Sequence, residues 1–169
     1  MAVPKLGPRA RALIRHFESC KLTAYRCSAG RWTVGVGMTY YPSGLPVRPG
    51  DRITPAEADE GFAHLLARDF EPGVAKAIGD ALTTPAQWGA MVALAYNIGV
   101  NAFAKSSVAR LHKAGDHDGA ARAFAAWNKE RRNGVLQISA GLTRRRAAEA
   151  ALYRGDFADL SSHTHGEVK

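Results

Sequence analysis

The stretch "HFESCKLTAYRCSAGRWTVGVGMT", residues 16–39, predicts a short helix followed directly by a β-hairpin. β-Branched and aromatic residues flank 28–30, Ser-Ala-Gly, which has the composition of a hairpin turn. Gly35 and Gly37 alternate inside the second expected strand, where glycine weakens pairing and usually marks a bulge or a close approach to the backbone. We expect a further short strand near Tyr40.

The helix before this hairpin ends at an acidic residue. Apolar side chains at helical spacing across 9–20 predict a short amphipathic helix. Glu18 falls near its C-terminal end, where a negative charge opposes the helix dipole by a few tenths of a kcal/mol, roughly. Glu18 is therefore not placed there to stabilise the helix.

A long helix is expected to follow the β region. Thr54, Pro55 and Glu57 form a strong helix start, with an N-cap, a proline in the first turn and a capping-box glutamate. Pro72 should end or kink this helix, yet the apolar pattern resumes up to Ile78. We expect one long bent helix or two helices in series.

The same start signal recurs at Thr84–Gln87 and opens an apolar helix that Gly99 should cap. Its uniform apolarity predicts the central helix of a bundle, with further helices within 106–115, 116–130 and 141–156 around it. The predicted fold class is α+β: a small antiparallel β-sheet lobe joined by a long helix to an α-helical lobe, with a cleft between the lobes. The expected boundaries within 1–169 are 1–53 for the N-terminal helix and β lobe, 54–80 for the connecting helix, 81–160 for the helical lobe, and 161–169 for a frayed tail.

The charge balance points to polyanionic partners without choosing one. Lys and Arg number 23 against 15 Asp and Glu, a formal net charge of +8. Nucleic acid, anionic membranes and bacterial cell-wall polymers all fit such a surplus. No apolar stretch approaches the ~20 residues of a membrane span, and the N-terminus has no secretory h-region. We expect a soluble, monomeric chain made in the cytoplasm without a signal peptide and without stable membrane insertion.

Metal and cofactor sites are not indicated. Cys20 and Cys27 are the only cysteines and form no CxxC pair, while the six histidines are scattered. Two cysteines in a chain without a signal favour free thiols over a small disulfide loop.

Glu18, Cys27 and Thr33 stand in the spacing Glu-x8-Cys-x5-Thr, followed by the glycines at 35 and 37. With this pattern the sequence resembles the bacteriophage-type lysozymes, the endolysins of glycoside hydrolase family 24, whose motif is Glu-x8-(Asp or Cys)-x5-Thr and then Gly-x-Gly. The resemblance extends over nearly the whole chain. It includes "ALAYNIGV" at 93–100, the Trp127-Asn128 pair and "GLTRRRAAEAAL" at 141–152. Met38 departs from it, since the family usually carries His at that position.

The resemblance implies hydrolysis of the β-1,4 bond between N-acetylmuramic acid and N-acetylglucosamine in peptidoglycan, with inversion. Glu18 would be the general acid, while Cys27 and Thr33 would hold the attacking water. A free cysteine has a pKa of about 8.5, so a thiol is a poor base near neutrality. Thr33 would therefore position the water, and Cys27 would polarise it or take its proton late.

The resemblance also implies substrate-binding residues: Gly35, Gly37, Tyr96, Asn97 and Arg144. Tyr96 and Asn97 would line the cleft floor, and Arg144 would reach across to pair with Glu18. We expect Trp127 in the core, and Arg145 and Arg146 on a solvated basic face.

Three other functions fit parts of the pattern. A lytic transglycosylase also uses one glutamate but no water, and the Cys27 and Thr33 positions favour a water-using enzyme. A basic helical domain could bind nucleic acid, but the cations are dispersed and no nucleic-acid motif appears. A wall-binding module without catalysis would tolerate loss of Glu18. We favour a muramidase that needs no cofactor, whose partner is bacterial peptidoglycan rather than nucleic acid, and which reaches the wall from outside or after the membrane is opened.

Overall fold

The computed structural model describes residues 4–165 and 168. Its N-terminal part consists of α1 (Pro8–Phe17), β1 (Lys21–Arg26) and β2 (Trp32–Gly35). The two strands pair antiparallel, with Tyr25 opposite Thr33, which confirms the predicted hairpin. The expected strand near Tyr40 is reduced to a single bridge between Tyr40 and Pro46, because the proline-rich loop cannot supply a continuous ladder.

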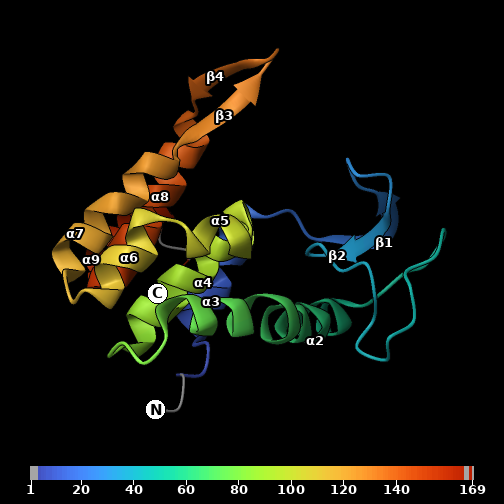
Figure 1. The fold of residues 1–169 in the computed structure, drawn as a ribbon. Coiled ribbons are helices and arrows are strands. Elements are labelled where there is room, and N and C mark those ends of the chain that lie inside the picture. Colours follow the sequence, from blue (N-terminus) through green and yellow to red (C-terminus); the bar gives the residue numbers. More distant parts are fainter. Residues whose placement is uncertain (1–3, 166–167, 169) are drawn as a thin grey trace.

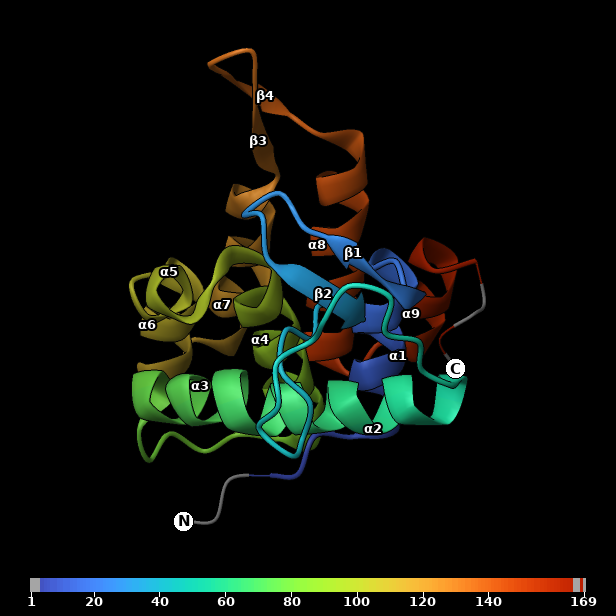
Figure 2. The ribbon, with the colours of Figure 1, turned by 90° about the vertical axis from the view of Figure 1, so that its right-hand side faces the viewer.

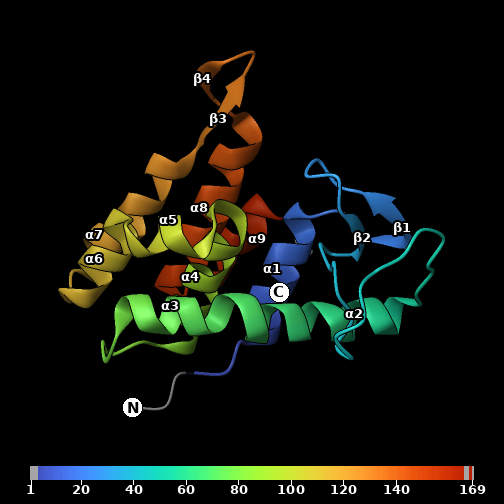
Figure 3. The same cartoon turned by 45° about the vertical axis from the view of Figure 1, so that its right-hand side comes forward.

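A continuous helical rod connects the two lobes (Figures 2 and 3). It is built from α2 (Pro55–Leu65), the π-helical turn η1 (Leu66–Phe70) and α3 (Glu71–Ile78). The predicted capping box is present: the Thr54 hydroxyl accepts from the Glu57 N–H, and the Glu57 carboxylate accepts from the Thr54 N–H. Before Pro72 the chain widens by one residue, so that the Glu71 N–H bonds the Leu66 carbonyl. This turn lets the helix pass the proline without ending.

The helical lobe surrounds α4 (Pro85–Ile98), whose residues 87–95 are all buried. The prediction of a central helix is confirmed, and α4 packs against α1 and α8. The remaining helices of the described chain are α5 (Val100–Ala104), α6 (Ser107–Lys113), α7 (His117–Ala123), the 3-10 turn η2 (Phe124–Trp127), α8 (Ala140–Arg154) and α9 (Phe157–His163).

A second hairpin, β3 (Lys129–Arg132) and β4 (Val135–Ile138), rises from the helical lobe (Figure 1). Sequence reasoning predicted a helix through residue 130 and missed this hairpin. Its signal was the Asn133-Gly134 pair: both residues have positive φ, 49° and 81°, as a tight hairpin turn requires.

The lobes have separate apolar clusters. The larger cluster fills the helical lobe, while Val34, Met38, Val47, Ile53 and Ala58 form a small core between β2 and α2. Helix α9 runs to His163, and the Thr164 and Val168 side chains are buried. Residues 166, 167 and 169 of the predicted tail lie outside the described chain. No helix of the described residues is long and apolar enough to cross a membrane.

Candidate active site

Glu18 is the residue at which α1 ends, and its backbone is extended, with φ −115° and ψ 139°. This change of direction carries its side chain away from the helix and into the space between the lobes. The carboxylate oxygen Oε1 lies 2.5 Å from Nη1 of Arg145, and the Glu18 side chain is 28% exposed while that of Arg145 is 5% exposed. Glu18 therefore has one buried cationic partner and one solvent-facing side.

That solvent-facing side opens into a cavity of about 410 Å³ between the lobes. The cavity lining includes both carboxylates and aromatic rings, which suits a sugar chain with polar edges and apolar faces. Its lining comes from both lobes and from the connecting rod: Glu18, Arg31, Gly37, Thr39, Leu65, Asp69, Phe70, Tyr96 and Asn97. Four of the residues singled out from the sequence are among them.

Cys27 closes β1 and is half-buried, and both cysteines are free thiols, as expected. The pKa of the Cys27 thiol is lowered, first by a hydrogen bond with the Thr33 side chain and then by the backbone N–H of Arg31. Cys27 and Thr33 are thus brought together across the hairpin. A lowered pKa increases the fraction of the thiol that is present as thiolate near neutral pH, and the thiolate is the form that can accept a proton.

Tyr25 connects this pair to Glu18. The pKa of Tyr25 is raised by burial and then by the negative charges of Cys27 and Glu18, so its hydroxyl lies within electrostatic reach of both. Thr33 is buried, and its hydroxyl donates to the Arg31 carbonyl at 3.1 Å. Since a hydroxyl has one proton, Thr33 can donate either to this carbonyl or to a neighbouring acceptor, and it can also accept.

The two glycines have different surroundings. Gly37 lines the cavity with φ +85°, and a Cβ there would lie 2.9 Å from the Tyr96 hydroxyl. Gly35 is buried, and a Cβ on it would point at Ile53 and Ala58 in the small core. The structure therefore places Gly37, but not Gly35, where a glycan could pass.

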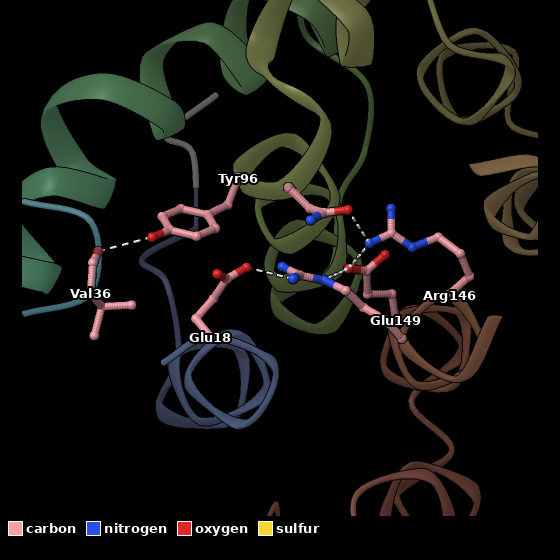
Figure 4. Close-up of polar contacts among 7 residues, drawn as sticks. Glu18, Val36, Tyr96, Arg146 and Glu149 are labelled. Atoms are coloured by element: carbon pink, nitrogen blue, oxygen red, sulfur yellow. Dashed lines mark hydrogen bonds and ion pairs between the residues drawn. The ribbon is translucent and has the colours of Figure 1, made fainter. Parts of the chain in front are cut away.

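Tyr96 ties the helical lobe to the strand lobe. Its hydroxyl donates to the Val36 carbonyl at 2.9 Å (Figure 4), and its ring lies 4.9 Å from that of Phe70. The pKa of Tyr96 is raised, mainly by burial and also by the charge of Glu18. The hydroxyl therefore stays protonated and available to donate.

A buried ionic cluster stands behind Glu18 (Figure 4). Glu149 is fully buried and accepts from Arg145 at 3.1 Å and from Arg146 at 2.9 Å. Arg146 in turn donates to the side-chain oxygen of Asn97 at 2.9 Å. Burial raises the pKa of Glu149 and lowers that of Arg146, while the attraction between the two opposes both shifts. The cluster fixes Arg145 beside Glu18 and Asn97 at the cavity.

Two expectations about the arginine run are wrong. Arg144 is exposed and lies outside the cavity, whereas Arg145 makes the ion pair with Glu18, and Arg145 and Arg146 are buried rather than solvated. The reason is helical phase: Arg145 shares the inward face of α8 with Ala148 and Glu149, one turn further on. The Arg-Arg-x-x-Glu spacing was the available signal, since residues three and four apart are neighbours on a helix.

Met38 is buried against Gly61, whose added Cβ would lie 2.5 Å from the Met38 sulfur. The position where the family usually has His thus extends the small apolar core. Trp127 is partly buried against the larger core, as expected.

Comparison with known proteins agrees with this geometry. A family model described as phage lysozyme matches residues 15–149. The chain is 32% identical over 151 residues to an endolysin of Acyrthosiphon pisum secondary endosymbiont phage 1, covering 88% of this chain and 97% of the relative.

Solved structures match over similar lengths. The endolysin from Escherichia coli O157:H7 phage FAHEc1 has a TM-score of 0.78 and 35% identity, covering 90% of this chain and 94% of its own. The muramidase domain of SpmX from Asticaccaulis excentricus has a TM-score of 0.78 and 31% identity, covering 89% and 98%.

The fold and the site define a glycoside hydrolase with its acidic residue between two lobes. The chain belongs to the phage lysozyme family, the endolysins of glycoside hydrolase family 24, and it is a peptidoglycan-degrading lysozyme.

Proposed function

We propose that Glu18 is the general acid that protonates the leaving oxygen of the β-1,4 bond between N-acetylmuramic acid and N-acetylglucosamine. The observation that carries this proposal is the position of its carboxylate, held on one side by buried Arg145 and open on the other to the inter-lobe cavity. Glycan hydrolysis needs an acid on one side of the sugar and a water on the other. Cys27 and Thr33 are not among the residues that line the cavity, but Tyr25 of the same hairpin lies within electrostatic reach of both Glu18 and Cys27.

Arg145 sets the orientation of the acid. Its guanidinium also lies over the ring of Phe17, 5.7 Å from the ring centroid, so the cation is held from two directions. To donate a proton, Glu18 must first carry one, and bound glycan would promote this by excluding water and bringing the glycosidic oxygen against the free side of the carboxyl. Arg145 then stabilises the carboxylate that remains after the transfer.

The attacking water is assigned to Cys27 and Thr33. In the proposed reaction the water oxygen bonds to the anomeric carbon as the bond to the leaving oxygen breaks. One water proton passes to the Cys27 thiolate, which becomes a thiol, and the configuration at carbon inverts. The lowered pKa of Cys27 supports this acceptor role, and the Thr33 hydroxyl supplies the second hydrogen bond to the water.

The remaining cavity residues would bind the glycan. Gly37, which has no side chain to meet the nearby Tyr96 hydroxyl, would present its backbone to a sugar, and Asn97 would offer its amide to an N-acetyl group. We further propose that the enzyme is a monomer that acts without nucleic acid and meets the wall once the membrane has been opened by another agent.

Hydrolysis of purified peptidoglycan tests the assignment. Glu18→Gln should lower the rate at least a hundredfold, roughly the contribution of a general acid, whereas Glu60→Gln, an exposed glutamate of α2, should leave it unchanged. Mass spectrometry should find reducing ends, and NMR should find the inverted anomer first. Anhydro ends would indicate a transglycosylase, and a Glu18→Gln variant as fast as the wild type would show the acid to be wrongly assigned.

Cys27 is tested separately. Cys27→Asp should keep measurable activity because a carboxylate also accepts a proton, while Cys27→Ala should lose most of it. Cys20→Ala, which removes the other free and more exposed thiol, is the matched control.

A further inference from the structure

The β3–β4 hairpin extends beyond the helices of its lobe (Figures 1 and 3). All four residues of β4 are exposed, and three of them are aliphatic: Val135 is 58% exposed, Leu136 56% and Ile138 69%. Exposed aliphatic side chains that gather in one short segment usually mark a surface that another body covers.

The strand register sorts the hairpin residues onto two faces. Lys129 pairs with Ile138, and Arg131 pairs with Leu136. Residues directly opposite each other in an antiparallel pair share a face, and alternate rungs share that face too. Lys129, Arg131, Leu136 and Ile138 therefore form one face, which we call the basic-apolar face.

The opposite face is chemically different. It carries Glu130, Arg132, Val135 and Gln137, and Nη2 of Arg132 lies 2.6 Å from the Glu130 carboxylate. The basic-apolar face holds no carboxylate, and within the described chain neither Lys129 nor Arg131 has an ion-pair partner. Arg131 donates to the Gly134 carbonyl at 2.6 Å, which keeps it on the hairpin without neutralising it.

We propose that the basic-apolar face docks the enzyme on an anionic phospholipid bilayer. The two cations would meet headgroup phosphates, and Leu136 and Ile138 would enter the boundary between headgroups and acyl chains. Each strand is about 13 Å long, enough to span the ~5–10 Å depth at which interfacial segments lie. Cations within reach of such a surface are drawn to it, and the net charge of +8 adds attraction at longer range.

A lipid surface fits this face better than a soluble polyanion does. Cations alone would suffice for nucleic acid or an acidic polysaccharide, whereas exposed Leu136 and Ile138 gain nothing from a hydrated polymer backbone. None of the hairpin residues lines the cavity next to Glu18, so docking leaves the catalytic groups free. The enzyme would thus be held beside the wall on the membrane that faces it.

Co-sedimentation of the full chain with vesicles tests the proposal. Vesicles of phosphatidylglycerol with phosphatidylethanolamine are compared with vesicles of phosphatidylcholine alone. The test variant is Lys129→Gln/Ile138→Ser, and the matched control is Arg132→Gln/Val135→Ser, which removes one cation and one aliphatic side chain from the opposite face of the same hairpin. Peptidoglycan hydrolysis and thermal unfolding, measured on each variant, show that fold and catalysis are intact.

We expect binding to the anionic vesicles only, with the test variant binding at least about fivefold more weakly, since one surface cation alone is worth about that factor. The control should change binding less than twofold. Equal loss in the two variants would mean that total charge and not this face matters, and would overturn the proposal. So would binding to phosphatidylcholine, failure of the wild type to sediment, or concentration-dependent self-association that the test variant abolishes.

Discussion

Acidification should destabilise the enzyme through one buried histidine, His112 of α6. Its ring is 1% exposed, with Nδ1 2.6 Å from the Tyr153 hydroxyl and Nε2 2.8 Å from the Thr83 hydroxyl. Burial, followed by the charge of nearby His117, lowers the pKa of His112 from 6.5 to about 4. His117 also contacts the same Tyr153 hydroxyl, at 3.3 Å.

The direction in which stability changes with pH depends on whether the folded or the unfolded state binds the proton more readily. Between pH 6.5 and 4 the unfolded chain takes up a proton at this histidine that the folded state refuses, so folding stability falls as pH falls through this window. The full difference of 2.5 pH units corresponds to about 3 kcal/mol. Most of it, about 2 kcal/mol, should be lost between pH 7 and pH 4.5.

Urea unfolding at pH 7 and pH 4.5 measures this loss. His112→Gln keeps a polar side chain and removes the titration, so its stability should fall about 2 kcal/mol less than that of the wild type over the same interval. His64→Gln, on α2, is the control and should behave as the wild type does. The same carboxylates are present in all three proteins, so the comparison isolates the histidine. An identical pH dependence in wild type and His112→Gln would refute the reasoning.

Three further substitutions test the site and its support. Glu149→Gln leaves buried Arg146 without a carboxylate partner and Arg145 with Glu18 alone, and should cost about 3 kcal/mol of unfolding free energy, measured in urea; a loss under 1 kcal/mol would contradict a role for the ion cluster. Arg145→Gln should slow peptidoglycan hydrolysis by roughly tenfold or more, because a charged hydrogen bond to Glu18 is lost. Arg144→Gln, which changes an exposed residue, should keep the rate within twofold of the wild type. A larger loss in Arg144→Gln than in Arg145→Gln would favour Arg144 as the partner of Glu18, as the sequence suggested. Gly37→Ala should lower both folding stability and the rate of hydrolysis more than Gly44→Ala does. Both glycines have positive φ, but only Gly37 faces the Tyr96 hydroxyl. Equal losses in the two variants would mean that backbone strain alone, and not the contact with Tyr96, causes the effect.

Local signals in the sequence predicted most of the architecture. The turn at 28–30, the capping boxes at Thr54 and Thr84, and the uniform apolarity of 87–95 each depend on neighbouring residues only, and each corresponds to an element of the structure. The second hairpin was missed because an alanine-rich segment with strong helix propensity runs directly into it. The Asn133-Gly134 turn favours strands on both of its sides, and this preference outweighs the helix propensity carried over from the alanine-rich segment.

The candidate site was less predictable, because its residues come from segments distant in sequence. The Arg-Arg-x-x-Glu spacing indicates which face of α8 turns inward, but the pairing of Arg145 with Glu18 also depends on how α8 packs against α1, a contact between segments far apart in sequence. Likewise, Gly35 and Gly37 are equivalent in sequence, yet only the packing of Ile53 and Ala58 shows that Gly35 serves the small core.

The π-helical turn in the connecting rod has a consequence for chain length. In a regular α-helix, Leu65 and Phe70 would be rotated about 140° apart, but both reach the cavity because the wider turn realigns them. The same number of residues wound as ordinary α-helix would deliver α3 with its angular phase offset by about 100°. The wider turn absorbs one extra residue, so a chain one residue longer than a regular helix still presents the same side of α3 to the core.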